Sequence, residues 1–384
     1  GAKIPDVATA RHAIASGKVD MVGMTRAHMT DPHLIRKIIE KREDEIRPCV
    51  GANYCLDRIY HGGAAYCIHN AAPGRELDMP HIIPKAEIRK KVVIVGTGPA
   101  GLEAARVAGE RGHDVVVFEA ADKPGGQIRL TAQSERRKEM ISIIDWRMNQ
   151  CAKLGVTFHF NTWAEAADVT ALNPDVVIVA TGGLPNLELF EQKGEQPHVV
   201  SAWDIISGDV KPAGKVLIYD ESGDHPALQA AEFADNAGAE VEIMTPDRTF
   251  SPGVMAMNLV PYMRALQDKD VTFTVTRRLL GVVQHGNKLT ATIGTDYSDH
   301  THEAQYDQVV VNYGTLPLDD LYFHLKPLSS NGGAVDHDAL INGLPQRVTR
   351  NPKGVFQLFR IGDAVSGRNT HAAIYDALRL VKDI

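Results

Sequence analysis

The sequence predicts an α/β protein with two parallel-sheet domains, each of which begins as strand, helix, strand. Residues 91–120 read KVVIVGTGPAGLEAARVAGERGHDVVVFEA, with an apolar run, a glycine turn, an alanine-rich helical run and a second apolar run. Residues 215–245 repeat this order with KVLIYD, a helical run and EVEIMT. The later segments VIVATGGLP and VVVNYGTLP match each other at Gly and Leu-Pro. This internal similarity indicates two copies of one plan, the Rossmann-like dinucleotide-binding domain.

The glycine turn of the first domain has the spacing G-x-G-x-x-G, with Gly96, Gly98 and Gly101. Gly96 permits a tight turn, Gly98 leaves room for a pyrophosphate, and Gly101 lets the helix lie close to the sheet. The following helix starts with Pro99 and Ala100 and directs its free amides at phosphate charge. The full order of strand, glycines, helix and strand is a specific signal for a nucleotide site.

Further segments of the first domain follow predicted strands and are candidates for contact with the same nucleotide. Glu119 lies about 20 residues beyond the glycines, where an acid can accept hydrogen bonds from an adenosine ribose. Small residues after the later strands let the chain pass close to a ligand. The remaining candidates are Gly126, Gln127, Thr181, Gly182, Gly362 and Asp363.

Asp363 decides which nucleotide the sequence favours. The glycine turn and Glu119 alone fit FAD, NAD or ADP. An Asp before the last helical run can bond ribityl hydroxyls, while the helix start faces the flavin or the pyrophosphate. Taken alone, Asp363 would serve equally well as a simple helix cap. The combination of elements predicts FAD.

Composition restricts the partners and the compartment. The 384 residues are 44% hydrophobic and 23% charged, with a formal net charge of -7, which argues against nucleic acid or an anionic membrane as the main partner. No apolar run is long enough to span a bilayer, and the start lacks the apolar core of a signal peptide. We therefore expect a cytoplasmic protein. The absence of an initial Met suggests a piece of a longer chain.

The four cysteines divide into a cluster and a single residue. Cys49, Cys55 and Cys67 lie close in sequence, which favours a metal over a disulfide framework in a cytosolic protein. Cys151 falls in a helical run of the first domain and is predicted to be a core residue.

The chain before the first domain shows weaker patterns. Within residues 1–47 we expect a helix over 6–17, a buried strand over 19–24, a loop over 25–32 and a helix over 33–41. Residues 48–90 have little periodicity and are predicted to be a cofactor-bearing or linking segment. The predicted domains are 91–187 with 335–384, and 188–334, the latter with a β-meander over 271–311.

Several segments together resemble a known family. GTGPAGLEAA, GGQ, ATGG and a late IGDA resemble flavoproteins with two dinucleotide-binding domains. DMVGMTRAHMTDPHLIRKI and IRPCVGANYCLDRIYHGGAAYCIHNAAPGRE resemble the trimethylamine dehydrogenase and 2,4-dienoyl-CoA reductase family. YCLDRIY and RNTHAAIYDALRL are most similar in wording to the N-methylproline and dimethylglycine demethylases. The resemblance spans essentially the whole chain.

This resemblance implies a larger enzyme. Residues 1–47 would be the last part of an FMN-binding TIM barrel, and the loop with Arg26 would hold the FMN phosphate. The barrel's substrate pocket is absent, so the catalytic residues are unknown. The implied activity is oxidation of a small N-methylated amine, with an electron-transfer flavoprotein as acceptor and a homo-oligomeric full-length state. Because trimethylamine dehydrogenase holds ADP in the first domain, ADP is the alternative to FAD.

Two departures from the family pattern bear on electron flow. The family holds a 4Fe-4S cluster with four cysteines, but Ala52 stands at the second position. The cluster could persist with another ligand, be a three-iron form or be lost, and the three cysteines could equally be metal-free buried thiols. In the second domain, the turn from Asp220 to Asp224 is acidic where NAD(P)H needs glycines. This favours a dehydrogenase over an NAD(P)H-dependent enoyl reductase, the second hypothesis. The third is a non-catalytic ADP-binding scaffold.

Overall fold

The computed structural model describes residues 4–188, 192–193 and 199–384. The described chain forms two compact units. Residues 1–3 of the predicted segment 1–47, and residues 189–191 and 194–198 of the predicted second domain, lie outside the description. The units comprise Gly1–Ala132, Arg136–Gly183 and Pro317–Ile384 in the first, and Gln133–Glu135 and Leu184–Leu316 in the second.

The first unit is built on a parallel five-stranded sheet in the order β16-β4-β1-β2-β3. Four of its strands are mainly apolar runs with buried residues on both faces, as expected for a parallel sheet covered by helices, whereas the edge strand β3 is largely exposed. The strands are β1 (Lys91–Val95), β2 (Asp114–Phe118), β3 (Thr157–His159), β4 (Val176–Val179) and β16 (Gln357–Arg360).

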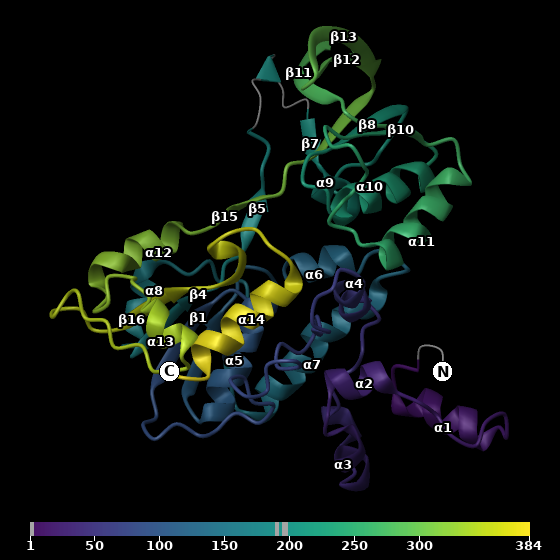
Figure 1. The fold of residues 1–384 in the computed structure, drawn as a ribbon. Coiled ribbons are helices and arrows are strands. Elements are labelled where there is room, and N and C mark those ends of the chain that lie inside the picture. The colour runs from purple at the N-terminus through teal and green to yellow at the C-terminus, as the bar shows by residue number, and fades with distance from the viewer. Residues whose placement is uncertain (1–3, 189–191, 194–198) are drawn as a thin grey trace. The chain divides into compact units, whose positions relative to one another are not determined.

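One face of this sheet is covered by α5 (Pro99–Arg111), α7 (Ser142–Lys153) and α14 (Thr370–Val381), which lie side by side in Figure 1. The helix α5 starts with Pro at its first position and ends at Gly112, whose φ of 92° suits a residue without a side chain. Its alanines are fully buried, which brings the helix close to the sheet. Cys151 is completely buried within this layer, which confirms the prediction that it is a core residue.

The opposite face is covered by α8 (Ala166–Ala171) and α12 (Asp320–Leu325), with Tyr322 and Leu325 in the same core cluster as Val93. The predicted second domain extended to residue 334, but the observed boundary lies between Leu316 and Pro317. The difference arises because the apolar side chains of α12 pack on the first sheet.

The first unit also contains short helices, and two short strands connect it with the second unit. The shorter helices are α1 (Val7–Ala15), α2 (Thr25–Thr30), α3 (Leu34–Ile39), η1 (Glu43–Glu45), α4 (Tyr54–Tyr60), α6 (Gln127–Thr131), η2 (Lys138–Ile141), η3 (Lys326–Leu328), α13 (His337–Ile341) and η4 (Gly362–Ala364). The chain passes between the units along β5 (Gly183–Pro185) and β15 (Thr315–Pro317), which pair with each other.

The N-terminal segment differs from its prediction at two places. Residues 19–24 form no strand, and Met21 is 85% exposed, because these residues pair with no neighbouring strand in the described chain. The predicted loop 25–32 contains the helix α2, in which Asp31 N donates to Ala27 O. The expected helices at 6–17 and 33–41 are present as α1 and the shorter α3.

The second unit repeats the parallel arrangement in the order β10-β9-β8-β14-β7. Its strands are β7 (Val199–Ser201), β8 (Lys215–Asp220), β9 (Glu240–Met244), β10 (Thr272–Thr274) and β14 (Gln308–Asn312), and its helices are α9 (Ala202–Ser207), α10 (His225–Asn236) and α11 (Ala256–Gln267). A second sheet has the order β13-β12-β11-β6, with β6 (Gln192–Lys193), β11 (Arg278–His285), β12 (Lys288–Thr295) and β13 (Ser298–Tyr306). The predicted meander is thus restricted to β11–β13 (Figure 1), since β10 and β14 join the parallel sheet.

Among the described residues, no helix combines the length and the apolar character that crossing a membrane requires.

Candidate nucleotide-binding site

The glycine turn after β1 is pressed against the end of β4. Gly96 has a φ of 106°, and a Cβ there would lie 2.3 Å from the carbonyl oxygen of Ala180. A Cβ at Gly101 would lie 2.0 Å from Gly96 O, so α5 also approaches the turn without space for a side chain. A Cβ at Gly98 would meet nothing within 4 Å. The first and third glycines are therefore required by packing, whereas the second opens onto free space at the start of α5.

Glu119 lies beside this turn, at the end of β2. Its Oε2 accepts hydrogen bonds from Thr97 N at 2.8 Å and from Thr97 Oγ1 at 2.5 Å. Its Oε1 accepts from Ala121 N at 2.9 Å. The carboxylate is thus fixed next to the glycine turn and is only partly buried. An acid in this position can accept hydrogen bonds from ribose hydroxyls.

The C-terminal part of the chain brings Asp363 to the same edge of the sheet. Gln127 Nε2 donates to Asp363 Oδ2 at 2.9 Å across 236 positions of sequence. Arg368 N donates to Asp363 Oδ1 at 3.2 Å, and burial raises the pKa of the carboxyl. The N-cap of α14 is Asn369, whose side chain accepts from Ala372 N. Asp363 is therefore not the cap of the last helix.

The small residues between these segments make close contacts. A Cβ at Gly362, where φ is 62°, would lie 2.9 Å from Ala100 Cβ. A Cβ at Gly126 would lie 3.5 Å from Gly98 Cα. Thr181 Oγ1 donates to Leu318 O, and Gly182 O accepts from Leu318 N at 3.0 Å. The predicted residues thus gather at the carboxyl ends of β1, β2, β4 and β16, where open α/β sheets bind ligands.

These residues fit an adenine dinucleotide such as FAD. The open face of Gly98 leaves the approach to the amides of α5 free of side chains. The carboxylate of Glu119 is bonded to Thr97 within the turn, and the carboxylate of Asp363 is bonded to Gln127. Pro99 at the first helical position costs no hydrogen bond within the helix, since the first amides of a helix have no partner there. The site combines a phosphate cradle with two acceptors for hydroxyl groups.

A family model described as pyridine nucleotide-disulphide oxidoreductase matches residues 90–377. The chain belongs to this family. It is 74% identical over 383 residues to the "Probable N-methylproline demethylase" of Rhizobium meliloti (strain 1021), which covers 100% of this chain and 56% of that protein. It is 44% identical over 391 residues to the "N,N-dimethylglycine/sarcosine dehydrogenase" of Chromohalobacter salexigens, which covers 99% of this chain and 56% of that protein. A solved complex of 2-naphthoyl-CoA reductase superposes with a TM-score of 0.81 at 27% identity, covering 98% of this chain and 52% of that chain.

The comparisons confirm the resemblance stated from the sequence, the α/β class and the assignment to the flavin-dependent oxidoreductases. The family match implies a flavin-binding domain. The chain spans about half the length of the curated relatives it matches.

In this member of the oxidoreductase family, Arg26 lies apart from the residues of the glycine turn. Its Nη1 donates to Asn53 Oδ1 at 2.9 Å, and its side chain lines a small cavity beside the cysteines. The predicted role of Arg26 in holding an FMN phosphate remains a prediction, since it concerns the barrel.

The small cavity lined by Cys49, Cys55 and Cys67 also contains Ala52 in its wall. Its volume of about 20 Å³ suits roughly one water molecule. Cys67 Sγ lies 3.5 Å from Thr30 Oγ1, and burial, with the other two thiols, raises the pKa of Cys55. All four cysteines are free.

The donor set of this cavity does not fit a four-iron cluster. Clusters of this kind are normally held by four thiolates. Three thiols are present, and the fourth corner carries the methyl group of Ala52, which offers no ligand atom. In the described part of the chain, no three His, Cys, Asp or Glu side chains are arranged to hold a metal ion.

A histidine beside the last helical run is expected from the sequence to be a packed surface residue without a role, but His371, in the first turn of α14, is buried under the cysteine segment, residues 49–67. It is 5% exposed, and its Nδ1 lies 2.8 Å from Cys67 O. Its ring stacks on Tyr54 and Tyr66, with ring centres 5.0 and 5.6 Å apart. Burial, with the charge of Arg75, lowers the pKa of His371 to about 4, so the ring is neutral near pH 7. The surface expectation was wrong because the sequence does not show that the cysteine segment covers the start of α14.

The turn after β8 in the second unit is closed by its own side chains. Asp220 is 1% exposed and accepts hydrogen bonds from Gly223 N at 2.9 Å, Asn312 Nδ2 at 2.9 Å and Ser251 Oγ at 3.3 Å. Asn312 Nδ2 also donates to Asp224 Oδ1 at 2.8 Å. Burial, with the nearby charge of Asp224, raises the pKa of Asp220 to about 7. A carboxyl group thus occupies the position where a nucleotide-binding turn has its first glycine.

Proposed function

We propose that this chain is the nucleotide-binding and electron-transfer part of a flavin-dependent demethylase or dehydrogenase of the trimethylamine dehydrogenase type. The observation that carries this proposal is the site after β1, where Gly98, Glu119 and Asp363 come together from three distant segments. The similarity over the whole chain to a protein named as an N-methylproline demethylase supports an N-methylated amine as the substrate of the full-length enzyme.

FAD is the proposed occupant of the first unit, with ADP as the alternative. Bound FAD would supply a flavin ring that accepts and donates electrons. Gly96, Gly98 and Gly101 would hold the pyrophosphate against α5, Glu119 the adenosine ribose, and Asp363 the ribityl chain. The Gln127–Asp363 hydrogen bond supports FAD because ADP has no ribityl hydroxyls for the second carboxylate to hold.

The remaining parts of the proposal concern the full-length protein. FMN in a preceding barrel would oxidise the amine, with Arg26 near its phosphate, and an electron-transfer flavoprotein would be the acceptor. A homo-oligomer is proposed for the full-length enzyme. The cysteine cavity does not fit a four-iron cluster, so no electron path is assigned through it.

An NAD(P)H-dependent enoyl reductase is the second candidate, and the name of the superposed reductase supports it. The closed turn at Asp220 argues against it, because a buried carboxyl repels a pyrophosphate and fills its approach. An ADP-binding scaffold is the third candidate. The deciding experiment is the absorption spectrum of the purified full-length protein with chromatography of the released cofactors. FAD in about one copy per chain supports the proposal, whereas ADP without any flavin favours the scaffold.

A further inference from the structure

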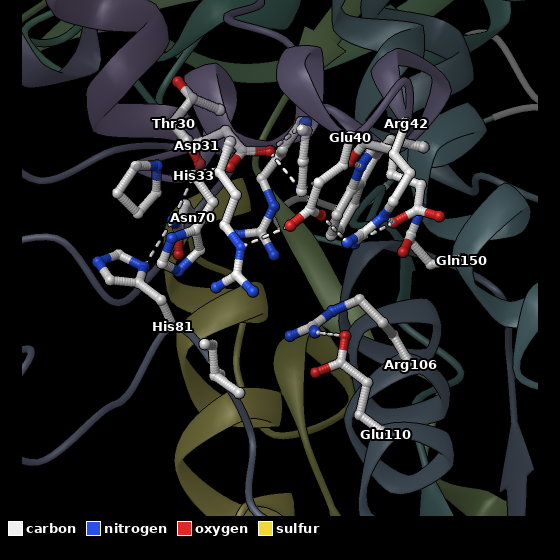
Figure 2. A pocket seen from close by; sticks show the side chains of 17 residues that line it. Thr30, Asp31, His33, Glu40, Arg42, Asn70, His81, Arg106, Glu110 and Gln150 are labelled. Atoms are coloured by element: carbon white, nitrogen blue, oxygen red, sulfur yellow. Dashed lines mark hydrogen bonds and ion pairs between the residues drawn. The ribbon is translucent and has the colours of Figure 1, made fainter.

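A second cavity, of about 330 Å³, lies in the first unit away from the glycine turn (Figure 2). Its walls come from the segment around α3 and η1, from the loop containing Asn70 and His81, and from α5 and α7. In Figure 2, His33, Asn70 and His81 lie on one side, while Arg106 and Glu110 of α5 lie opposite Glu40 and Arg42. None of the predicted nucleotide-site residues lines this cavity.

The charged side chains in its wall leave one positive charge unmatched. Five are cationic and four are anionic. The four carboxylates each have a cationic partner, in the pairs Lys37–Asp31 at 2.6 Å, Arg36–Glu40 at 2.8 Å, Arg42–Glu45 at 2.7 Å and Arg106–Glu110 at 2.6 Å. The fifth cation is Arg47.

Arg47 is a buried cation without a carboxylate partner. Its residue is 9% exposed, and only its backbone N–H donates to Asp31, at 2.9 Å from Oδ2. Its guanidinium carbon lies 4.1 Å from the centre of the Trp146 ring, and within the described ranges no group accepts a hydrogen bond from the guanidinium. Burial, with the charge of Arg106, lowers the pKa of Arg47 to about 10, which leaves it charged near pH 7.

The two neighbouring arginines, Arg106 and Arg147, do have a carboxylate partner. Arg106 and Arg147 both donate to the buried carboxylate of Glu103, at 2.6 and 2.8 Å. A buried charge that lacks such a partner is costly, and an anion at the guanidinium would offset that cost. The stacking on Trp146 fixes the plane of the guanidinium but supplies no acceptor for its N–H groups.

A second group in the same wall also lacks a partner. His33 Nε2 is buried, and in the described part of the chain it has no hydrogen-bond partner. In the tautomer with its proton on Nε2, it can donate to an oxygen in the cavity. His81 lies beside it, with ring centres 6.3 Å apart, and accepts from Asn70 Nδ2 through Nδ1 at 3.3 Å. Its Nε2 faces Glu76 Oε1 at 3.6 Å, so His33 is the histidine of this wall whose Nε2 has no partner in the described chain.

We propose that this cavity is a binding site for a small molecule that carries one oxyanion group, held by the Arg47 guanidinium and by His33. A guanidinium offers two parallel N–H groups that match a carboxylate or a phosphate. The single unmatched charge favours a singly charged carboxylate over a phosphate dianion. The volume is at the lower end of the range for small-molecule pockets, which agrees with a compact ligand. This site is separate from the proposed FAD site and does not depend on it.

Trp146 provides the measurement. In the 384-residue chain with Trp163→Phe and Trp203→Phe, Trp146 is the remaining tryptophan, because the chain has three. Sodium acetate and sodium phosphate are titrated separately, with sodium chloride added to hold the ionic strength constant. We expect a saturable change in Trp146 emission with both anions. We also expect a lower dissociation constant for acetate than for phosphate, because the cavity has a single unmatched positive charge. Tighter binding of phosphate would identify a phosphoryl group as the ligand class and keep the oxyanion site.

Arg47→Gln should weaken binding about tenfold or more, since a charge-assisted pair is lost. Arg36→Gln is the matched control, because Arg36 lines the same cavity but is exposed and paired with Glu40. It should change the affinity by less than about twofold. Far-ultraviolet circular dichroism and calorimetric titration, which needs no tryptophan, separate loss of binding from loss of fold. Absence of saturation in the parent chain, or equal losses in the two folded variants, would overturn the proposal.

Discussion

The turns after β1 and β8 begin the same strand–turn–helix plan and have opposite properties. After β1, Gly98 opens onto free space, and the carboxylate of Glu119 lies at the neighbouring strand end. After β8, the carboxyl of Asp220 is inside the turn itself and is held by Gly223, Asn312 and Ser251. Both sheets keep parallel strands and covering helices. The difference shows that the same strand–turn–helix plan can carry either an open glycine turn or a turn closed by its own side chains.

The largest effect is expected from Gly98→Val. The backbone φ of Gly98 is −65°, and a Cβ there meets no atom within 4 Å, so the variant should fold. The branched side chain would occupy the approach of the pyrophosphate, and we expect at least about a hundredfold loss of nucleotide affinity. Cofactor content per folded chain is the measurement.

The second turn supplies the matched control for that variant. Ser222→Val alters an exposed residue of the closed turn and should leave the cofactor content unchanged. Full nucleotide occupancy in folded Gly98→Val would show that the site is misplaced.

The second prediction concerns reduced pyridine nucleotides. Stopped-flow mixing of the full-length enzyme with NADH or NADPH should leave the flavin oxidised, because the turn after β8 has no open phosphate cradle. Dithionite serves as the positive control for a reducible flavin. Bleaching of the flavin by either nucleotide on a catalytic timescale would show that the enzyme accepts NADH or NADPH despite the closed turn after β8. That result would favour the reductase.

The third prediction uses the raised pKa of Asp220. The pKa is about 7 in the folded protein against 3.8 for an ordinary Asp, so the folded state binds the proton more tightly than the unfolded state. Its contribution to stability is therefore fully present below about pH 4 and is lost as the pH rises through about 7. Asp220→Asn keeps a polar side chain without the charge, and should stabilise the chain by up to about 4 kcal/mol at pH 8 and by much less at pH 4.

Denaturant unfolding of both forms at the two pH values measures this difference. Asp224→Asn removes only the neighbouring charge that helps to raise the pKa of Asp220, so it should stabilise the chain at pH 8 by less than Asp220→Asn does. An equal stabilisation of Asp220→Asn at both pH values would contradict the assignment of a buried, titrating carboxyl to Asp220.

The smallest effect is expected at the cysteine cavity, where Ala52 stands at the position of the family's second cysteine. The native chain should contain little or no iron after handling in air, and Ala52→Cys should raise iron and sulfide after anaerobic reconstitution. Iron and sulfide analysis with EPR on both forms is the measurement. A full, air-stable four-iron cluster in the native chain would show that another group completes the ligand set.

Local patterns were sufficient where strand, turn and helix are consecutive. The β1–α5–β2 unit and β8 lie within a residue or two of their predicted positions, because buried apolar runs and glycine spacing act locally. Asp363 was predicted for the nucleotide site because it follows a strand and precedes a helix, and the structure places it beside Gln127, 236 positions away.

The wrong predictions concern segments whose structure depends on contacts with residues far away in the sequence. Residues 19–24 have strand composition but no strand to pair with. His371 is buried only because Tyr54 and Tyr66 pack over it, and residues 317–334 join the first unit through Tyr322 and Leu325. The sequence also did not predict that Arg47 lacks a carboxylate partner, because ion pairing depends on contacts between distant parts of the chain, such as the contact of Arg47 with Trp146.

The position of β16 at the edge of the first sheet has a consequence for synthesis on the ribosome. The strand β4 pairs with β1 on one side and with β16 on the other, and residues 184–316 of the second unit are translated between them. At ordinary elongation rates, the apolar edge of β4 would wait on the order of ten seconds for its partner. During that interval the nascent chain therefore presents the unpaired edge of β4, and an unpaired apolar edge can associate with other chains.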